Sequence, residues 1–163
     1  MIVMNVLKKI IVFCLVLFAL FSPSWVMAHS IEYESVNPKD GFNYGLKRFE
    51  EKVRLFWTFS KSKKSGYYLK LSDARLAELK FTVDQKDMAN FETSTTRYFS
   101  TIGQYVEFLK NKKVSYNKDE IQAKFADHTE ILQVLRDKFD SEAAEWRFLQ
   151  DDINYLDNYL SSL

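Results

Sequence analysis

The chain has 163 residues, with 23 basic and 22 acidic side chains and a formal net charge of +1. Charged residues make up 28% and hydrophobic residues 47% of it, a composition that excludes a disordered chain. Only four glycines and two prolines are present, which argues against a fold of many strands joined by tight turns. The near-neutral charge argues against a nucleic-acid-binding protein, because such a protein needs a strongly basic face.

The first 28 residues have the pattern of a secretory signal peptide. Lysines precede an apolar run at 10–21, and Val26 and Ala28 fit the −3 and −1 positions of a cleavage site. We therefore expect cleavage after Ala28 and a periplasmic or extracellular protein. The alternative is an uncleaved membrane anchor, but the run is shorter than the roughly 20 residues that a membrane span needs. Cleavage would remove Cys14, the sole cysteine, and with it all thiol chemistry.

After the signal peptide we expect a short linker over 29–43 and one helical domain over 44–163. A first helix is predicted from about Asn43 to Phe59, because apolar residues recur at steps of three and four, at Leu46, Phe49, Val53 and Phe56. The polar run 60–65 is predicted to form a corner. A second helix should then extend to about Phe81.

A third helix of about 30 residues is predicted after Asp84, whose carboxylate suits an N-cap. Its 3-4 spacing is typical of a bundle helix. The apolar seam consists of Met88, Phe91, Thr95, Tyr98, Ile102, Tyr105 and Leu109.

The last segment, 117–163, begins with a capping-box pattern at Asn117 and Glu120. Its seam keeps the 3-4 phase across Asp140-Ser141, which favours one helix, whereas compactness favours two, because about 47 residues would span about 70 Å. Both readings stay open. The seam consists of Ile121, Phe125, His128, Leu132, Leu135, Phe139, Glu142, Trp146, Leu149, Ile153, Leu156, Leu160 and Leu163. With no strand pattern, the sequence predicts an all-α bundle of about four to five amphipathic helices, two of them long.

Short motifs follow one another between residues 38 and 80. They are Leu46-Lys47-Arg48, Glu51, Leu55-Phe56, Thr58-Phe59, Tyr68-Leu69-Lys70-Leu71 and Arg75-Leu76-Ala77-Glu78. In these motifs the chain resembles an uncharacterised bacterial family of exported or membrane-anchored helical proteins, a domain of unknown function. The resemblance implies a helical fold and an envelope location, and it implies no activity.

Two histidines are the first candidates for chemistry. Cleavage would make His29 the mature N-terminus, where the amine and imidazole could chelate copper, but no second ligand is placed near it. His128 lies on an apolar seam without the companions of a metal or catalytic site, so we interpret it as a structural core residue. No phosphate loop, nucleophile elbow or calcium loop is present. The sequence therefore predicts a protein that is not an enzyme and has no cofactor or metal site.

Aromatic and basic residues gather around the first predicted corner. The main expectation is that the aromatic residues pack in the core, and the alternative is an exposed surface for an anionic membrane. The candidate interaction surface consists of Arg48, Lys52, Trp57, Lys61, Lys63, Lys64 and Tyr67. The leading functional hypothesis is an exported, non-enzymatic structural or protein-interaction module of the envelope, and the second is peripheral membrane binding through segment 46–68.

Overall fold

The computed structural model describes residues 41–112 and 114–163, so the predicted signal peptide and most of the linker lie outside the described residues. The described residues form five helices and no strand, which confirms the all-α prediction. The helices are α2 (Gly41–Trp57), α3 (Lys61–Asp84), α4 (Met88–Lys112), α5 (Lys118–Arg136) and α6 (Ala144–Ser161).

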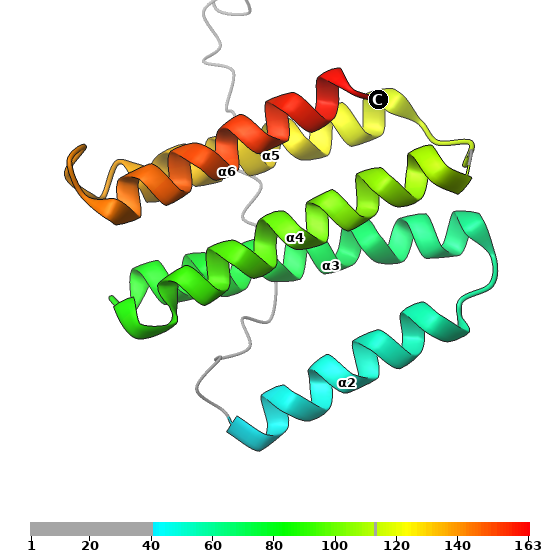
Figure 1. Ribbon diagram of the computed structural model, residues 1–163, viewed down its shortest axis with the longest axis horizontal. Helices are drawn as coiled ribbons and strands as arrows, with labels where there is room; N and C mark the ends of the chain where they lie inside the picture. Colours follow the sequence, from blue (N-terminus) through cyan, green and yellow to red (C-terminus); the bar gives the residue numbers. More distant parts are fainter. Residues whose placement is uncertain (1–40, 113) are drawn as a thin grey trace, which may run out of the picture. The chain divides into compact units, whose positions relative to one another are not determined.

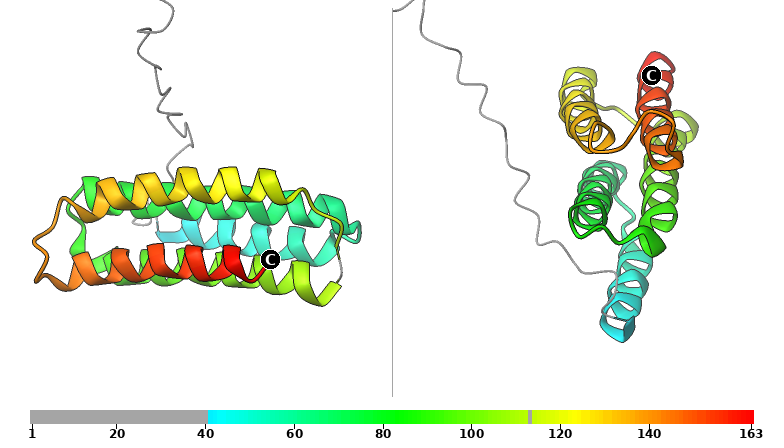
Figure 2. Two further views of the ribbon diagram at one scale, coloured as in Figure 1. Left: turned by 90° about the horizontal axis from the view of Figure 1, so that it is seen from above. Right: turned by 90° about the vertical axis from the view of Figure 1, so that its left-hand side faces the viewer.

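Helices α3 to α6 run alongside one another as two hairpins, α3–α4 and α5–α6 (Figure 1). The hairpins also contact each other through α4 with α6 and α3 with α5, so the four helices enclose one core. The end-on view of Figure 2 shows α2 outside this group of four. The bundle core therefore belongs to α3–α6, and α2 is an addition to its surface.

The predicted seams fill this core. Tyr98, Ile102, Tyr105 and Leu109 of α4 are all buried, and Met88 at its start is the seam residue that remains exposed. From the last segment the buried seam residues are Ile121, Phe125, His128, Leu132, Leu135, Leu149, Ile153 and Leu156. Burial of these side chains is the main contribution to the free energy of folding, since each apolar side chain removed from water contributes about 1.5–3 kcal/mol.

The last segment forms two helices, with residues 137–143 between them. Asp140 explains the break. Its carboxylate Oδ1 accepts a hydrogen bond of 2.9 Å from the backbone N–H of Glu142, and its carbonyl accepts one from Ala143. These local bonds replace the helical ladder, as Asp side chains do in turns. The seam stays in phase across the break because both helices bury the same stripe in one core.

Two predicted boundaries are wrong. The polar run 60–65 is not a corner, because α3 already begins at Lys61 and the Ser60 carbonyl accepts from the N–H of Lys64 at 2.9 Å. The run contains neither glycine nor proline, the residues that most disfavour a helix. Its polar side chains can remain in water on an exposed helical turn. The corner is limited to 58–60.

Asp84 is not an N-cap. It is the last residue of α3, and its carboxylate pairs with Lys80 at 2.6 Å and with Lys138 at 2.5 Å. The chain turns at Lys86, whose φ of 53° lies in the left-handed region, and α4 begins at Met88. By contrast, Asn117 caps α5 as predicted, with its side chain accepting from the N–H groups of Asp119 and Glu120.

Candidate functional site

Helix α2 carries its apolar stripe on the outside of the molecule. The exposed fraction of these side chains ranges from 37% at Val53 to 80% at Phe59. We call this surface the α2 apolar face; it consists of Leu46, Phe49, Val53, Phe56, Trp57 and Phe59. Trp57 packs edge-on against Phe56 and Phe59, with ring centroids 5.8 and 6.3 Å apart. The prediction that the aromatic residues of this region pack in the core is therefore wrong for Phe56, Trp57 and Phe59.

The opposite side of α2 is polar and faces the bundle. Tyr44 and Glu51 are buried there. Arg75 of α3, which is fully buried, forms ion pairs with Glu51 and with Glu78 of its own helix. The Tyr44 hydroxyl donates to Glu78 Oε2 at 3.1 Å and accepts from Arg97 of α4. This buried ion-pair cluster (Tyr44, Glu51, Arg75, Glu78 and Arg97) fixes which face of α2 points inward.

The electrostatics of the cluster keep Tyr44 neutral. Burial raises the pKa of Tyr44 to about 12, and the negative charge of Glu78 adds to the increase. Burial also raises the pKa of the Glu78 carboxyl, which the charge of Arg75 partly opposes. A buried arginine with two carboxylates is stable only while all three are present, since removing one partner typically costs about 3–5 kcal/mol. The orientation of α2 thus depends on ion pairing.

Basic residues are frequent in the segment that carries the α2 apolar face. Between Tyr44 and Tyr68 there are seven basic and two acidic residues, a net charge of +5 in a chain whose total is +1. Positive charge is therefore concentrated in the segment that also exposes the aromatic side chains.

The structure divides the predicted interaction residues into two groups. Lys52, Trp57, Lys61 and Lys63 are exposed, and Lys61 Nζ donates to the Lys112 carbonyl at 2.8 Å. The half-buried residues have partners within the fold. They are Arg48, which pairs with Glu51 at 3.2 Å, Lys64, which lies 6.0 Å from the centre of the Phe108 ring, and Tyr67, which lies under the Arg54 guanidinium at 5.6 Å.

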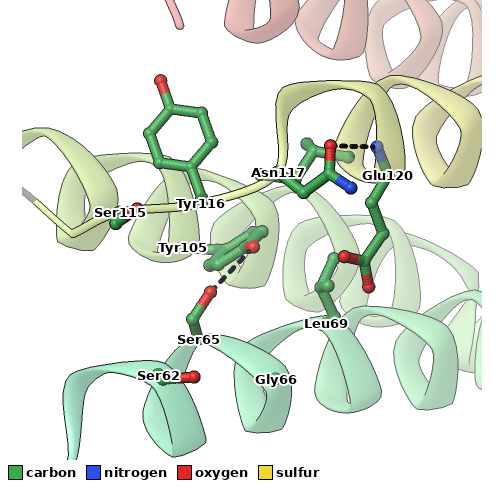
Figure 3. Close-up of a pocket in the computed structure, with 10 residues that line it drawn as sticks. Ser62, Ser65, Gly66, Leu69, Tyr105, Ser115, Tyr116, Asn117 and Glu120 are labelled. Carbon is green, nitrogen blue, oxygen red and sulfur yellow. Dashed lines mark hydrogen bonds between the residues drawn. The ribbon is translucent and has the colours of Figure 1, made fainter.

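A polar pocket of about 210 Å³ lies between the first turns of α3 and the connection from α4 to α5 (Figure 3). Its walls carry the hydroxyl groups of Ser62, Ser65, Tyr105, Ser115 and Tyr116. The hydroxyl oxygens of Ser65 and Tyr105 are 3.1 Å apart and hydrogen-bonded to each other. A nucleophilic serine needs an adjacent base, and the bonded partner of Ser65 is a phenol, so this pair lacks the arrangement of a hydrolase.

His128 is a structural core residue, as predicted. It is fully buried, its Nε2 lies 2.8 Å from Asp73 Oδ1, and its Nδ1 lies 3.0 Å from the Tyr98 hydroxyl. Asp73 also pairs with Lys124 at 3.2 Å. Asp73 belongs to α3 and is 55 residues from His128 in sequence, so only the packing of the bundle brings the two side chains together.

The family model of a domain of unknown function, DUF5667, matches residues 35–142. The chain belongs to this family. The match includes the motifs of segment 38–80 that suggested the resemblance, and it covers α2 to α5 of the structure. No curated protein and no solved structure matches the chain.

Helix α6 lies outside the segment matched by the DUF5667 model, yet it supplies Leu149, Ile153 and Leu156 to the core. Asp152 lies among them, and one of its carboxylate oxygens is buried without a hydrogen-bond partner. Burial raises the pKa of Asp152 to about 8, with a further contribution from the charge of Asp151. In the described part of this DUF5667 protein, no three His, Cys, Asp or Glu residues group into a metal site, and no helix is both long and apolar enough to cross a bilayer.

Proposed function

We propose that this protein is an exported, non-enzymatic interaction module of the cell envelope whose interaction surface is the α2 apolar face. The observation that carries the proposal is the outward orientation of six apolar side chains on and next to one helix. Contiguous exposed apolar surface is uncommon on monomeric proteins and marks sites for proteins or membranes. The buried ion-pair cluster supports the proposal, because it holds this orientation although the reverse one would bury more apolar surface.

The charge around the face favours an anionic membrane surface as its occupant. Helices that lie in a membrane interface combine an aromatic and aliphatic face with flanking lysines and arginines. Segment 44–68 has this composition, with a net charge of +5 and Phe49, Phe56 and Trp57 exposed. A protein partner in the envelope is the second candidate, because exposed aromatic side chains are also enriched in protein interfaces.

Co-sedimentation with lipid vesicles tests the membrane occupant. At low salt the protein should bind vesicles that contain phosphatidylglycerol and should not bind neutral phosphatidylcholine vesicles. The double substitution Phe49→Ser with Phe56→Ser should weaken binding at least about tenfold, because each exposed phenylalanine loses its apolar contact with lipid. The control is Val134→Ser, since Val134 is an exposed apolar residue on α5, away from the face. The variants share residues 1–28, so any contribution of that apolar segment is the same in all of them.

Absence of binding to anionic vesicles would reject the membrane as occupant. A protein partner would then be sought by cross-linking in the native envelope. The Phe49→Ser and Phe56→Ser double variant would serve as the negative control. If the variant is still cross-linked to the same partner, the α2 apolar face is not the binding site for that partner.

The export part of the proposal rests on the signal pattern and has its own test. N-terminal sequencing of the protein recovered from the producing cells should find His29 as the first residue. A protein that retains Met1 and stays in the cytoplasm would contradict export. The non-enzymatic part would be contradicted by substrate turnover in a metabolite screen, provided that a substitution on the protein abolishes it.

A further inference from the structure

A second hollow lies on the bundle side of α2, opposite the α2 apolar face. It has a volume of about 190 Å³ and is bounded by α2, α3 and α4. Four basic side chains line it, namely Arg48, Lys52, Arg75 and Arg97, whereas Glu51 is the sole acidic residue in its lining. We call this hollow the α2–α4 pocket.

Its positive charges exceed the carboxylates that face them. Glu51 is shared between Arg48 and Arg75, and Arg75 also pairs with Glu78. Within the described residues, no carboxylate lies within ion-pair distance of Lys52 or Arg97. Arg97 donates to the neutral Tyr44 hydroxyl and lies 4.9 Å from the centre of its ring. The α2–α4 pocket therefore carries about two positive charges without a counter-charge from these groups.

The polar atoms around these charges suit an oxyanion. Arg75 is fully buried, yet its Nε has no hydrogen-bond partner in the described structure. Ser100 and Gln104 of α4 line the same pocket and can donate hydrogen bonds. Bonds from guanidinium and ammonium groups to phosphate or carboxylate are about twice as strong as neutral ones. A buried donor without an acceptor costs free energy, so Arg75 adds an unsatisfied N–H group to the residues around the pocket.

The size of the pocket limits the ligand. Drug-sized molecules occupy pockets of about 300–1,000 Å³, so a hollow of about 190 Å³ suits a compact group. A phosphate group, with one or two negative charges, matches both the volume and the excess charge. Lys52 is exposed although it lines the pocket, so it lies at the rim, where an incoming anion meets it first.

We propose that the α2–α4 pocket binds a phosphate group, supplied either by a soluble phosphate ester or by the headgroup of an anionic lipid. The bound group would bridge Lys52 of α2 and Arg97 of α4, and so would also stabilise the docking of α2. This proposal does not depend on the occupant of the α2 apolar face, since a soluble ester can bind whether or not the protein binds membranes.

Titration calorimetry with glycerol 3-phosphate tests the pocket at constant ionic strength. The protein should bind one equivalent, and Lys52→Gln with Arg97→Gln should weaken binding at least tenfold. Lys63→Gln is the control, because Lys63 is exposed and is absent from the pocket lining. A second variant, Ser100→Asp, places a negative charge in the pocket while Arg97 keeps its contact with Tyr44, and it should also weaken binding at least tenfold. Circular dichroism confirms that each variant is folded.

No saturable binding up to about 10 mM ligand, or equal binding by the protein and both pocket variants, would overturn the proposal. A competition experiment then identifies the source of the phosphate. If glycerol 3-phosphate displaces the protein from phosphatidylglycerol vesicles, the lipid headgroup occupies the pocket. If glycerol 3-phosphate binds but does not reduce vesicle binding, the ligand is a soluble ester. If glycerol 3-phosphate binds and the protein does not bind vesicles at all, the ligand is again a soluble ester. In that second case the membrane is rejected as the occupant of the α2 apolar face, whereas the phosphate site in the pocket is supported.

Discussion

His128 Nε2 and Asp73 Oδ1 lie 2.8 Å apart in the middle of the bundle, joining α5 to α3 across 55 residues of sequence. A carboxylate can only accept, so the hydrogen of this bond is assigned to Nε2, and Nδ1 lies 3.0 Å from the Tyr98 hydroxyl. Burial raises the pKa of Tyr98 well above its usual value, with the charges of Asp152 and Asp73 adding to the increase, so Tyr98 remains a neutral donor. The hydrogen bonds of Asp73, His128 and Tyr98 thus connect helices α3, α5 and α4.

Substitution of His128 should destabilise the fold. His128→Leu fills the seam with apolar volume, but it leaves the Asp73 carboxylate and the Tyr98 hydroxyl without their shared partner. We expect a loss of about 2–4 kcal/mol in the free energy of unfolding, measured by urea denaturation. Asp127→Asn, an exposed neighbour on the same helix, is the control and should change stability by less than about 0.5 kcal/mol. A His128→Leu protein as stable as the parent would show that the hydrogen bonds of His128 with Asp73 and Tyr98 do not contribute to the free energy of unfolding.

Asp152 should make stability depend on pH. Its folded pKa of about 8 lies above its unfolded value, so the folded chain binds more protons between about pH 4 and pH 8. This contribution to stability is complete below about pH 4 and is lost as the pH rises through about 8. An asparagine side chain resembles the protonated acid, so Asp152→Asn should remove this decrease in stability with rising pH. The variant should therefore be more stable than the parent above pH 8. Thermal unfolding from pH 5 to pH 9 measures the difference, and parallel curves for the two proteins would contradict it.

Removal of Arg75 should release α2 from the bundle. Arg75→Gln leaves the carboxylates of Glu51 and Glu78 buried without their cation, which should cost about 3–5 kcal/mol locally. Because the bundle core belongs to α3–α6, amide hydrogen exchange should accelerate in α2 far more than in α4. The control is Glu50→Gln, which breaks an exposed pair with Arg54 of 3.8 Å but keeps the contact of Arg54 with Tyr67, and it should leave the exchange of α2 unchanged. Uniform acceleration across all helices would indicate that α2 is part of the cooperative core.

Two glycines within helices should respond differently to alanine. Gly66 of α3 has open space where a Cβ would be placed, so Gly66→Ala should stabilise the protein by about 0.5–1 kcal/mol. At Gly103 of α4 a Cβ would lie 2.8 Å from the Tyr159 hydroxyl oxygen of α6. The tyrosine must move to admit it, which offsets the gain in helix propensity. Urea denaturation should therefore find Gly66→Ala the more stable variant, and the reverse order would contradict the close approach of α4 and α6.

The spacing of apolar residues along the chain predicts the helices and most of the core. Spacing at three and four residues identified the buried seams of α4, α5 and α6, because a helix must bury a continuous stripe to be stable in water. The Asn117 cap was equally predictable, since its partners are the next residues in the chain. Periodicity does not reveal the break after Arg136, because it shows only which face is apolar, and that face is the same for two consecutive helices in one core.

The orientation of α2 and the composition of the candidate sites depend on contacts between residues that are far apart in the sequence. Periodicity correctly identified an apolar stripe on this helix, but a stripe does not specify whether a core lies against it. Glu51 and Arg75 are 24 residues apart, and Tyr44 and Arg97 are 53 apart, so no local pattern relates them. Once the bundle places Arg75 in its interior, its charge requires carboxylates, and Glu51 on the polar side of α2 supplies one. The apolar side is then left facing outward, because one helix has room for only one docked face.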